Sequence, residues 1–244
     1  MNDQLKHFYE QQSTPWMTLF YRLVAAQLPV CSGKKILDFG AGFGWTANAL
    51  ALNNEVLALE PNLDMVANHC ETHPYEMRCG GLSELKKLPA ESFDLILCHN
   101  VLEYVCDQAE RQEILAEFAR LVSTDGKISV IKHHFPGAIM QRIVFENHLD
   151  EAQMLLDGTA NHRSSFGVIH YYDLAVLTEN IPLKVDKKYG IGAFNRLQPN
   201  AFKNTGDWLE KMFRLEMTCA EKSEFRDIAF FNHLLLQKAK SDEA

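Results

Sequence analysis

Three glycines at alternate positions directly follow a short apolar run that ends in an acidic residue. The segment is Ile36-Leu37-Asp38-Phe39-Gly40-Ala41-Gly42-Phe43-Gly44. Because glycine has no Cβ, the backbone can turn tightly there and a ligand can approach it closely. The next residues, Trp45 to Leu52, have the pattern of a helix, whose first turn presents free N–H groups and a positive dipole end. A strand, turn and helix of this kind can bind a nucleotide-like cofactor.

A second carboxylate occupies an equivalent place one strand later. Glu60 ends the apolar run that begins at Glu55, and a carboxylate at that point can accept hydrogen bonds from both hydroxyls of a ribose. Open α/β sheets bind ligands outside the carboxyl ends of their strands. We therefore expect Asp38 and Glu60 to line one site; the alternative for each is a helix cap or a surface charge.

The glycine spacing discriminates between two cofactor classes. Dinucleotide-binding folds carry GxGxxG, whereas here the third glycine comes one residue early and Trp45 follows it. The spacing therefore disfavours a nicotinamide-dependent oxidoreductase, which stays open as an alternative.

GxGxG after an acidic strand end, together with the segment Phe93 to Val105, resembles class I S-adenosylmethionine (SAM) methyltransferases over about residues 33–238. The resemblance implies SAM as cofactor and S-adenosylhomocysteine (SAH) as product. It implies that Asp38 faces the amino group of the methionine part and that Glu60 holds the ribose. The other implied cofactor contacts are the backbone of Gly40, Ala41 and Gly42, with Pro61 and Asn62 beside the adenine. Many relatives carry an acidic adenine ligand near residues 79–83; this chain does not, so Leu82 or Ser83 is expected there.

Two histidines follow strands on the acceptor side. His99 comes directly after the fourth strand and is expected to be either a wall of the methyl-transfer site and weak base, or a packed histidine whose backbone meets the cofactor. His133 ends the fifth strand, where acceptor-side residues of the family often lie. Glu103 is expected to begin a helix. A metal site is not expected, because the sequence has no HxxxH pair or Cys/His cluster.

The acceptor is less well specified. The chain looks most similar to the bacterial tRNA wobble-uridine carboxymethyl methyltransferases, through residues 94–97 with His99, residues 101–103 and the C-terminal region 215–238. The leading expectation is a methyl acceptor that is a small molecule or a modified nucleotide; the tRNA wobble reaction and a non-catalytic SAM-binding protein are alternatives. Seven basic residues are candidates for a tRNA-binding patch, and the alternative is that they are simply solvated surface residues. They are Arg142, Lys184, Lys187, Lys188, Arg196, Lys203 and Arg214.

The elements that must position these residues alternate between strand and helix. Strands are expected at 35–39, 55–60, 76–79, 93–98, 127–131, 183–189 and 228–237, and helices at 1–30, 45–52, 65–72, 108–121, 171–180 and 207–217. A turn is expected at 123–126 and a polar loop at 161–165. This order predicts an α/β fold with helices on both faces of the sheet. With the resemblance, it predicts a Rossmann-like seven-stranded, mostly parallel sheet whose last strand is antiparallel. One domain, 1–244, would carry N-terminal helices (1–32) and a helical lid inserted after strand five (136–170).

Composition limits the remaining choices. The 244 residues include 24 basic and 32 acidic side chains, a net charge of −8, which argues against coating nucleic acid by bulk charge. The six cysteines include no CxxC pair, and neither a secretory signal nor an apolar run of about 20 residues is present. We expect a cytoplasmic protein that acts on a small molecule or tRNA and binds neither DNA nor a membrane. Its oligomeric state is left open. The aromatic residues expected to cover the cofactor are Tyr9, Trp16, Tyr171 and Tyr172.

Overall fold

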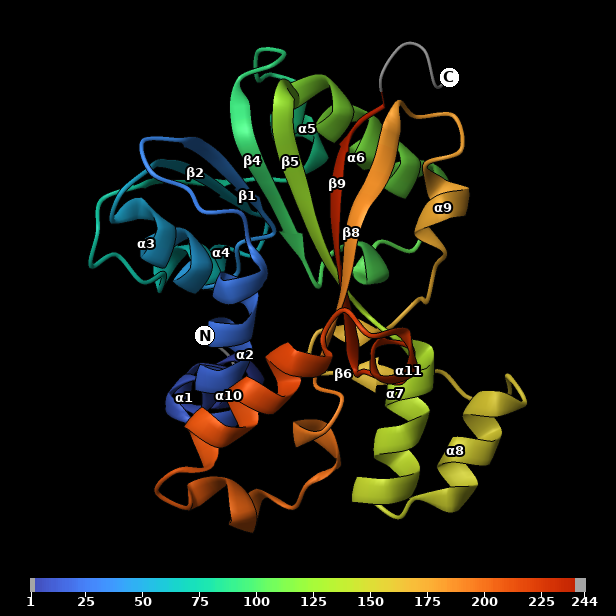
Figure 1. The fold of residues 1–244 in the computed structure, drawn as a ribbon. Helices are drawn as coiled ribbons and strands as arrows, with labels where there is room; N and C mark the ends of the chain where they lie inside the picture. Colours follow the sequence, from blue (N-terminus) through green and yellow to red (C-terminus); the bar gives the residue numbers. More distant parts are fainter. Residues whose placement is uncertain (1–2, 240–244) are drawn as a thin grey trace.

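A seven-stranded sheet organises the computed structural model, which describes residues 3–239. The strand order is β3-β2-β1-β4-β5-β9-β8 (Figure 1). The strands are β1 (Lys35–Phe39), β2 (Glu55–Glu60), β3 (Glu76–Cys79), β4 (Phe93–His99), β5 (Val122–His133), β8 (Leu183–Ile191) and β9 (Phe231–Lys238). Strands β1 to β5 pair in parallel, and β9 lies antiparallel to both β5 and β8. The predicted sheet, with its antiparallel last strand, is confirmed.

Apolar strands explain why both faces of the sheet are covered. Successive side chains of a strand point to opposite faces, so Leu37 joins the core beneath α6 while its neighbour Ile36 joins the core beneath α3. Strands buried on both faces read as continuous apolar runs. The helices are α1 (Asp3–Glu10), α2 (Pro15–Gln27), α3 (Trp45–Ala51), α4 (Leu63–Ala67), α5 (Leu82–Leu85), α6 (Gln108–Leu121), α7 (Phe135–Met140), α8 (Leu149–Leu156), α9 (Leu174–Leu177), α10 (Trp208–Cys219) and α11 (Ser223–Arg226).

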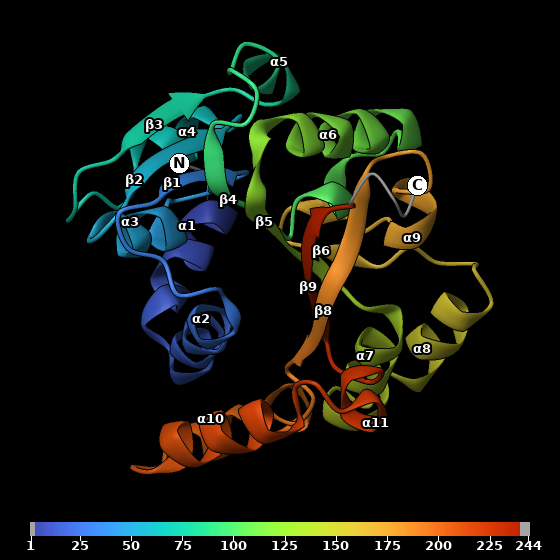
Figure 2. The same ribbon diagram turned by 45° about the horizontal axis from the view of Figure 1, so that its top comes forward.

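The carboxyl ends of the parallel strands meet at one edge, and a second group of helices gathers beyond that edge. Figures 1 and 2 show α1, α2, α7, α8 and α10 there, whereas α3 and α6 flank the sheet. The segment after β5 supplies α7, the π-helix η3 (Gln141–Phe145), α8 and a small hairpin of β6 (Arg163–Ser164) and β7 (Gly167–Val168). The expected lid segment therefore consists of helices and a hairpin beside the edge where ligands of α/β sheets bind.

Two predicted helices are shorter than the sequence pattern indicates, because polar side chains end them. The helix predicted at 65–72 is α4, which stops at Ala67, where the Asn68 amide donates to the Asp64 carbonyl. The helix predicted at 171–180 is α9, which begins only after its N-cap Asp173, and the Thr178 hydroxyl donates to the Leu174 carbonyl at its end. Side chains that bond to nearby backbone compete with continued helix.

Two predicted loops are strands. The turn expected at 123–126 belongs to β5, which begins at Val122 and shifts register opposite Phe93 and Leu95. The polar loop expected at 161–165 contains β6, because Arg163 and Ser164 pair with Val168 and Gly167. Among residues 3–239 no helix is long and apolar enough to cross a membrane.

Candidate active site

The glycine turn lies between β1 and α3, and all three of its glycines have positive φ: +73° at Gly40, +59° at Gly42 and +71° at Gly44. A Cβ on Gly40 would collide with the Val101 side chain, and one on Gly44 with the Tyr75 hydroxyl. Gly42 differs, because a Cβ there would meet only the Met65 sulfur, at 3.9 Å. Two glycines thus let the turn pack closely, and the middle one leaves room above the backbone.

Asp38 lies at the base of this turn with an unsatisfied oxygen. Its side chain is buried, and Oδ2 has no hydrogen-bond partner among the residues that the structure describes. Burial, and secondarily the charge of Glu60, raises the pKa of Asp38 to about 7. A buried carboxylate oxygen without a partner is unfavourable, and a ligand ammonium group placed against Oδ2 would relieve it. This residue therefore fits the amino group of a bound amino-acid moiety.

Glu60, at the end of β2, ties the neighbouring strand to the turn. Its Oε2 accepts from the backbone N–H of Gly42 at 2.8 Å, and its Oε1 accepts from that of Asn62 at 2.8 Å. Burial raises the pKa of Glu60, while these two N–H groups oppose the rise. A carboxylate oxygen can accept more than one hydrogen bond. Each oxygen of Glu60 thus retains capacity for a ribose hydroxyl.

The residues expected beside the adenine lie around the ends of β2 and β3. Pro61 is exposed, whereas the Asn62 side chain is committed to the α4 cap, where Oδ1 accepts from the backbone N–H groups of Asp64 and Met65. Leu82 and Ser83 begin α5, with Leu82 packed on the core and Ser83 exposed. The side chain of Asn62 is therefore a helix cap, and its backbone N–H already donates to Glu60.

His99 belongs to a buried chain of hydrogen bonds. Its Nε2 lies 2.7 Å from the Ser129 hydroxyl, which lies 2.7 Å from Nε2 of His233, and Nδ1 of His233 lies 2.8 Å from Oε1 of Gln27. Burial, with the His233 ring nearby, holds the pKa of His99 well below its usual range. This arrangement favours the packed interpretation of His99. This chain could not be predicted from the sequence, because Gln27, Ser129 and His233 come together only in the folded sheet.

His133 is held by Glu103. Nδ1 of His133 lies 2.6 Å from Oε1 of Glu103, and the same oxygen accepts the His133 backbone N–H at 3.1 Å. Glu103 lies in the short 3-10 helix η2 (Leu102–Tyr104) and is almost fully buried, so it does more than begin a helix. A carboxylate partner keeps the proton on Nδ1 of a neutral imidazole and leaves Nε2 as the basic nitrogen. Expecting only a helix start at Glu103 missed this pairing.

The β6–β7 hairpin connects this pair to the N-terminal helix. The Tyr104 hydroxyl and the Ser164 hydroxyl lie 2.8 Å apart. The Phe166 ring stands edge-on to the Phe8 ring of α1, with centroids 4.8 Å apart, and 6.1 Å from the Tyr104 ring. Tyr9 in turn lies 5.1 Å from the Phe43 ring of the glycine turn. These contacts close an aromatic cover over the carboxyl edge of the sheet.

The other aromatic residues expected at the cofactor have different surroundings. Tyr171 lies with its hydroxyl 2.5 Å from Nδ1 of His162, and Trp16 lies beside the Lys203 ammonium group, 5.5 Å from ring centre to Nζ. The Tyr172 hydroxyl is buried without a partner in the described part of the chain. Only Tyr9 of the four packs against the glycine turn.

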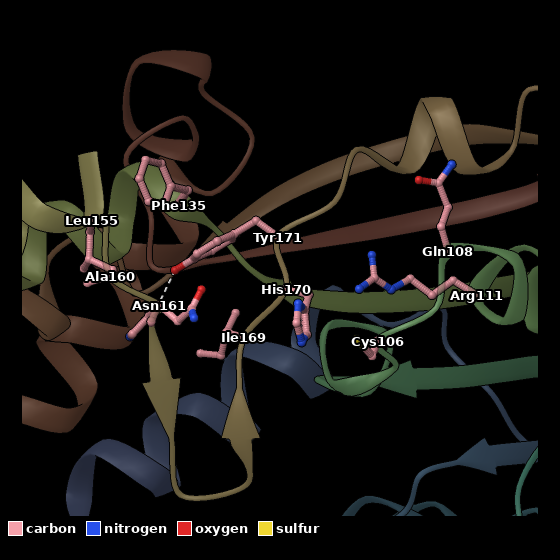
Figure 3. A pocket seen from close by; sticks show the side chains of 11 residues that line it. Cys106, Gln108, Arg111, Phe135, Leu155, Ala160, Asn161, Ile169, His170 and Tyr171 are labelled. Atoms are coloured by element: carbon pink, nitrogen blue, oxygen red, sulfur yellow. Dashed lines mark hydrogen bonds between the residues drawn. The ribbon is translucent and has the colours of Figure 1, made fainter. Parts of the chain in front are cut away.

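A separate cavity of about 420 Å³ opens beneath the insertion. Figure 3 shows its lining, where the Tyr171 side chain extends toward Asn161 and away from His170 and Arg111. His162 also lines it, and the ring centroid of His162 lies 6.3 Å from that of His133. Burial, with His133 and Arg142 nearby, lowers the pKa of His162 to about 4. The cavity thus adjoins the Glu103–His133 pair rather than the glycine turn.

Within residues 3–239 no three histidine, cysteine or acidic side chains are grouped so that they could hold a metal ion.

Comparison with known proteins identifies the class. Residues 37–130, which hold the glycine turn, Glu60 and Glu103, match a family model described as a methyltransferase domain. A comparison with curated protein sequences gave no match.

Solved structures share the fold. One is a chain of the Haloferax volcanii complex between the Trm112 methyltransferase activator and a methyltransferase, at 16% identity over 96% of this chain and 93% of that chain, with a TM-score of 0.60. A SAM-dependent methyltransferase from Mesorhizobium loti matches at 18% identity, over 90% and 98%, with a TM-score of 0.58. A TehB-like SAM-dependent methyltransferase from Corynebacterium glutamicum matches at 16%, over 90% and 87%, with a TM-score of 0.52. At these identities the likeness establishes the fold alone.

The match gives residues 37–130 a methyltransferase domain, set in a sheet that SAM-dependent methyltransferases of solved structure share. The match decides against the nicotinamide-dependent alternative, and it leaves the acceptor unidentified.

Proposed function

We propose that this enzyme binds SAM at the carboxyl ends of β1 and β2 and methylates a small molecule. The unpartnered Oδ2 of buried Asp38 carries the proposal, because it is suited to the ammonium group of the cofactor. Glu60 would hold the ribose, the backbone of Gly40, Ala41 and Gly42 would lie along the methionine part, and the residues from Pro61 to Asn62 and from Leu82 to Ser83 would surround the adenine. The product cofactor would be SAH.

SAM, when bound, supplies an electrophilic methyl group on a sulfonium that leaves as a thioether. The chain's own task is to align the acceptor and exclude water, and orientation can contribute about 7–11 kcal/mol in ideal cases. Nε2 of His133 is available to take a proton, since Glu103 fixes the proton of a neutral ring on Nδ1. This supports an acceptor hydroxyl or amine that loses its proton during attack. The packed ring of His99 would then leave its backbone to meet the cofactor.

Isothermal titration with SAM and SAH tests the cofactor site. The Glu60→Ala variant should bind SAH about 10- to 100-fold more weakly than the wild type, because it loses two charge-assisted hydrogen bonds. Glu55→Ala is the matched control, because Glu55 begins the same strand at the opposite end and makes only a surface ion pair with Lys35, at 3.6 Å. Unchanged affinity in Glu60→Ala would refute the ribose assignment.

The alternative acceptor, a carboxymethylated wobble uridine in tRNA, needs cations on the surface. Three of the seven candidate basic residues are engaged elsewhere: Arg142 pairs with Glu146, Lys203 is buried, and Arg196 packs on the rings of Phe230 and Phe231. This supports a small acceptor over tRNA. Mass spectrometry of tRNA nucleosides from a deletion strain tests the choice, and a lost wobble-uridine methyl ester would favour tRNA.

A further inference from the structure

Arg111 of α6 is a buried cation without an acidic partner. The residue is only 6% exposed, and its Nε donates to the Val105 carbonyl at 2.7 Å. Its two terminal nitrogens take part in no hydrogen bond or ion pair with the residues that the structure describes. Arginine is almost never so buried unless it is paired, and a buried guanidinium group without a partner is unfavourable. The donors of both terminal nitrogens therefore remain for a ligand.

The groups around Arg111 do not neutralise its charge. Its Cζ lies 5.5 Å from the centre of the Tyr172 ring, and the Lys132 ammonium group lies 4.6 Å from the centre of the same ring. The carboxylates of Asp107 and Asp173 cap α6 and α9, where they accept backbone N–H groups at 3.0 and 2.9 Å. Contact with a ring compensates only part of what a cation loses on leaving water. Two cations thus share one aromatic ring, and neither has an ion-pair partner within residues 3–239.

Arg111 lines the cavity of about 420 Å³ beneath the insertion. Figure 3 shows its side chain extending from α6 toward His170, with Ile169 farther along the hollow. The rings of Phe135 and Tyr171 belong to the same lining and stand edge to face, 5.0 Å between centroids. Sites for small molecules measure about 300–1,000 Å³. The cavity thus has the size of a small-molecule site, with a cation at one end and aromatic walls.

We propose that this cavity binds a small carboxylic acid, that the terminal nitrogens of Arg111 hold its carboxylate, and that this acid is the methyl acceptor. A carboxylate matches the planar fork of a guanidinium group with two parallel hydrogen bonds. The rings of Phe135 and Tyr171 favour an acid with an aromatic body. The inference rests on the proposed function, and it names the acceptor class for the same site.

Two residues of the cavity lining also contact the Glu103–His133 pair. The backbone N–H of His170 donates to the Glu103 carbonyl at 2.9 Å. The His162 ring stands edge-on to the His133 ring, with 6.3 Å between centroids. Both His162 and His170 line the cavity. The proposed base is therefore a direct neighbour of the cavity wall.

The two ends of the cavity differ in charge, which orients the acid. Nδ1 of His162 lies 2.5 Å from the Tyr171 hydroxyl, and Figure 3 shows Tyr171 extending away from Arg111. Burial lowers the pKa of His162 to about 4, so its ring is neutral at pH 7 and does not compete for the anion. The carboxylate therefore lies at the Arg111 end. A hydroxyl or amine of the acid lies at the other end, beside His162 and its neighbour His133.

Benzoate, with benzamide as its uncharged match, probes the cavity. Binding to the full chain is measured by calorimetry at pH 7 with SAH present. We expect benzoate to bind at least about 10-fold more tightly than benzamide. Arg111→Gln should reduce this ratio to about one and leave benzamide affinity unchanged, which the loss of a merely structural residue would not do. Arg214→Gln, which removes an exposed cation of α10, should keep the ratio.

Ala160→Phe tests the cavity independently, because Ala160 lines it and Arg111 stays in place. The added ring should weaken benzoate and benzamide alike, by at least about 10-fold. Thermal unfolding of each variant checks that it is folded. Three results would each overturn the proposal: benzoate no tighter than benzamide in the wild type, an unchanged ratio in Arg111→Gln, or unchanged affinities in Ala160→Phe.

A crystal structure with SAH and benzoate together tests the acceptor role. The carboxylate should lie on the terminal nitrogens of Arg111, and the benzoate ring should be open to the SAH sulfur with no side chain between them. Benzoate separated from SAH by a wall of side chains would overturn its assignment to the acceptor. Failure of the wild type to bind SAH would instead overturn the cofactor site.

Discussion

Glu103 and His133 come from two different elements and meet with 2.6 Å between Oε1 and Nδ1. The same carboxylate oxygen also accepts the His133 backbone N–H, so the imidazole is fixed in both position and tautomer. We propose that this geometry makes His133 a directed base. It would let the enzyme act on an acceptor that must lose a proton.

Replacing Glu103 should change the tautomer of His133. In Glu103→Gln the amide can offer either its oxygen or its N–H₂ group to Nδ1, so the neutral ring should become a mixture of both tautomers. Nitrogen-15 NMR of the imidazole reports this directly. Glu110→Gln, an exposed change at the start of α6, should leave the spectrum unaltered, and a pure Nδ1–H tautomer in Glu103→Gln would contradict the assigned role.

Asp38→Asn should weaken the binding of the cofactor and stabilise the ligand-free protein. The folded pKa of Asp38, about 7, lies above the usual 3.8, so the buried charge destabilises the fold increasingly as pH rises from about 4 to 7. At 1.36 kcal/mol per pKa unit this amounts to at most about 4 kcal/mol at pH 8. Thermal unfolding should show a higher melting temperature for Asp38→Asn at pH 8 and little difference at pH 4.

A lower stability of Asp38→Asn would contradict the view that the buried charge of Asp38 destabilises the ligand-free protein. If Asp38→Asn is less stable than the wild type at pH 8, the carboxylate is satisfied in the ligand-free protein. Calorimetry should independently show SAH binding at least 10-fold weaker, because the neutral amide no longer attracts an ammonium group.

Gly40→Ala should destabilise the protein more than an ordinary surface change. The residue has φ of +73°, and a Cβ would collide with Val101, so the expected loss is about 1–3 kcal/mol. Gly206→Ala is the control, since a Cβ there meets nothing within 4 Å and φ is not in the left-handed region. Urea unfolding measures both, and equal stabilities would show that the turn adapts.

Phe166→Ala should loosen the aromatic cover over the site. Removing this ring breaks its contacts with Phe8 and Tyr104, so hydrogen exchange should speed up in β6, β7 and α1 while the strands of the sheet stay protected. Val176→Ala removes a comparably exposed side chain from α9 and should leave exchange in α1 unchanged. Unaltered exchange in α1 of Phe166→Ala would mean that the hairpin does not hold the helix.

The parts of this fold that could be predicted from sequence are those encoded locally. Each buried strand is an apolar run, and the three closely spaced glycines predict the turn. Helix ends were harder, because Asn68 and Thr178 end α4 and α9 through side-chain bonds that compete with the helix. The turn expected at 123–126 is instead an irregular part of β5, between Val122 and Lys127, which pair with Phe93 and Leu95 of β4.

Some residues of the candidate site could also be predicted from the sequence, and others could not. Asp38 and Glu60 could be assigned from their places at strand ends, and the structure puts both beside the glycine turn. Glu103 with His133 could not, because the two residues are 30 positions apart and meet only in the folded sheet. In the sequence, Arg196 and Lys203 look like ordinary surface residues. In the structure they pack against the rings of Phe230, Phe231 and Trp16.

A crystal structure of the enzyme with SAH tests the central claim most directly. The ligand's amino group should lie within hydrogen-bond distance of Asp38 Oδ2 and both ribose hydroxyls on Glu60, with the adenine near Pro61 and Leu82. SAH seated instead in the cavity lined by Arg111, His162 and His170, with Asp38 and Glu60 uncontacted, would contradict it.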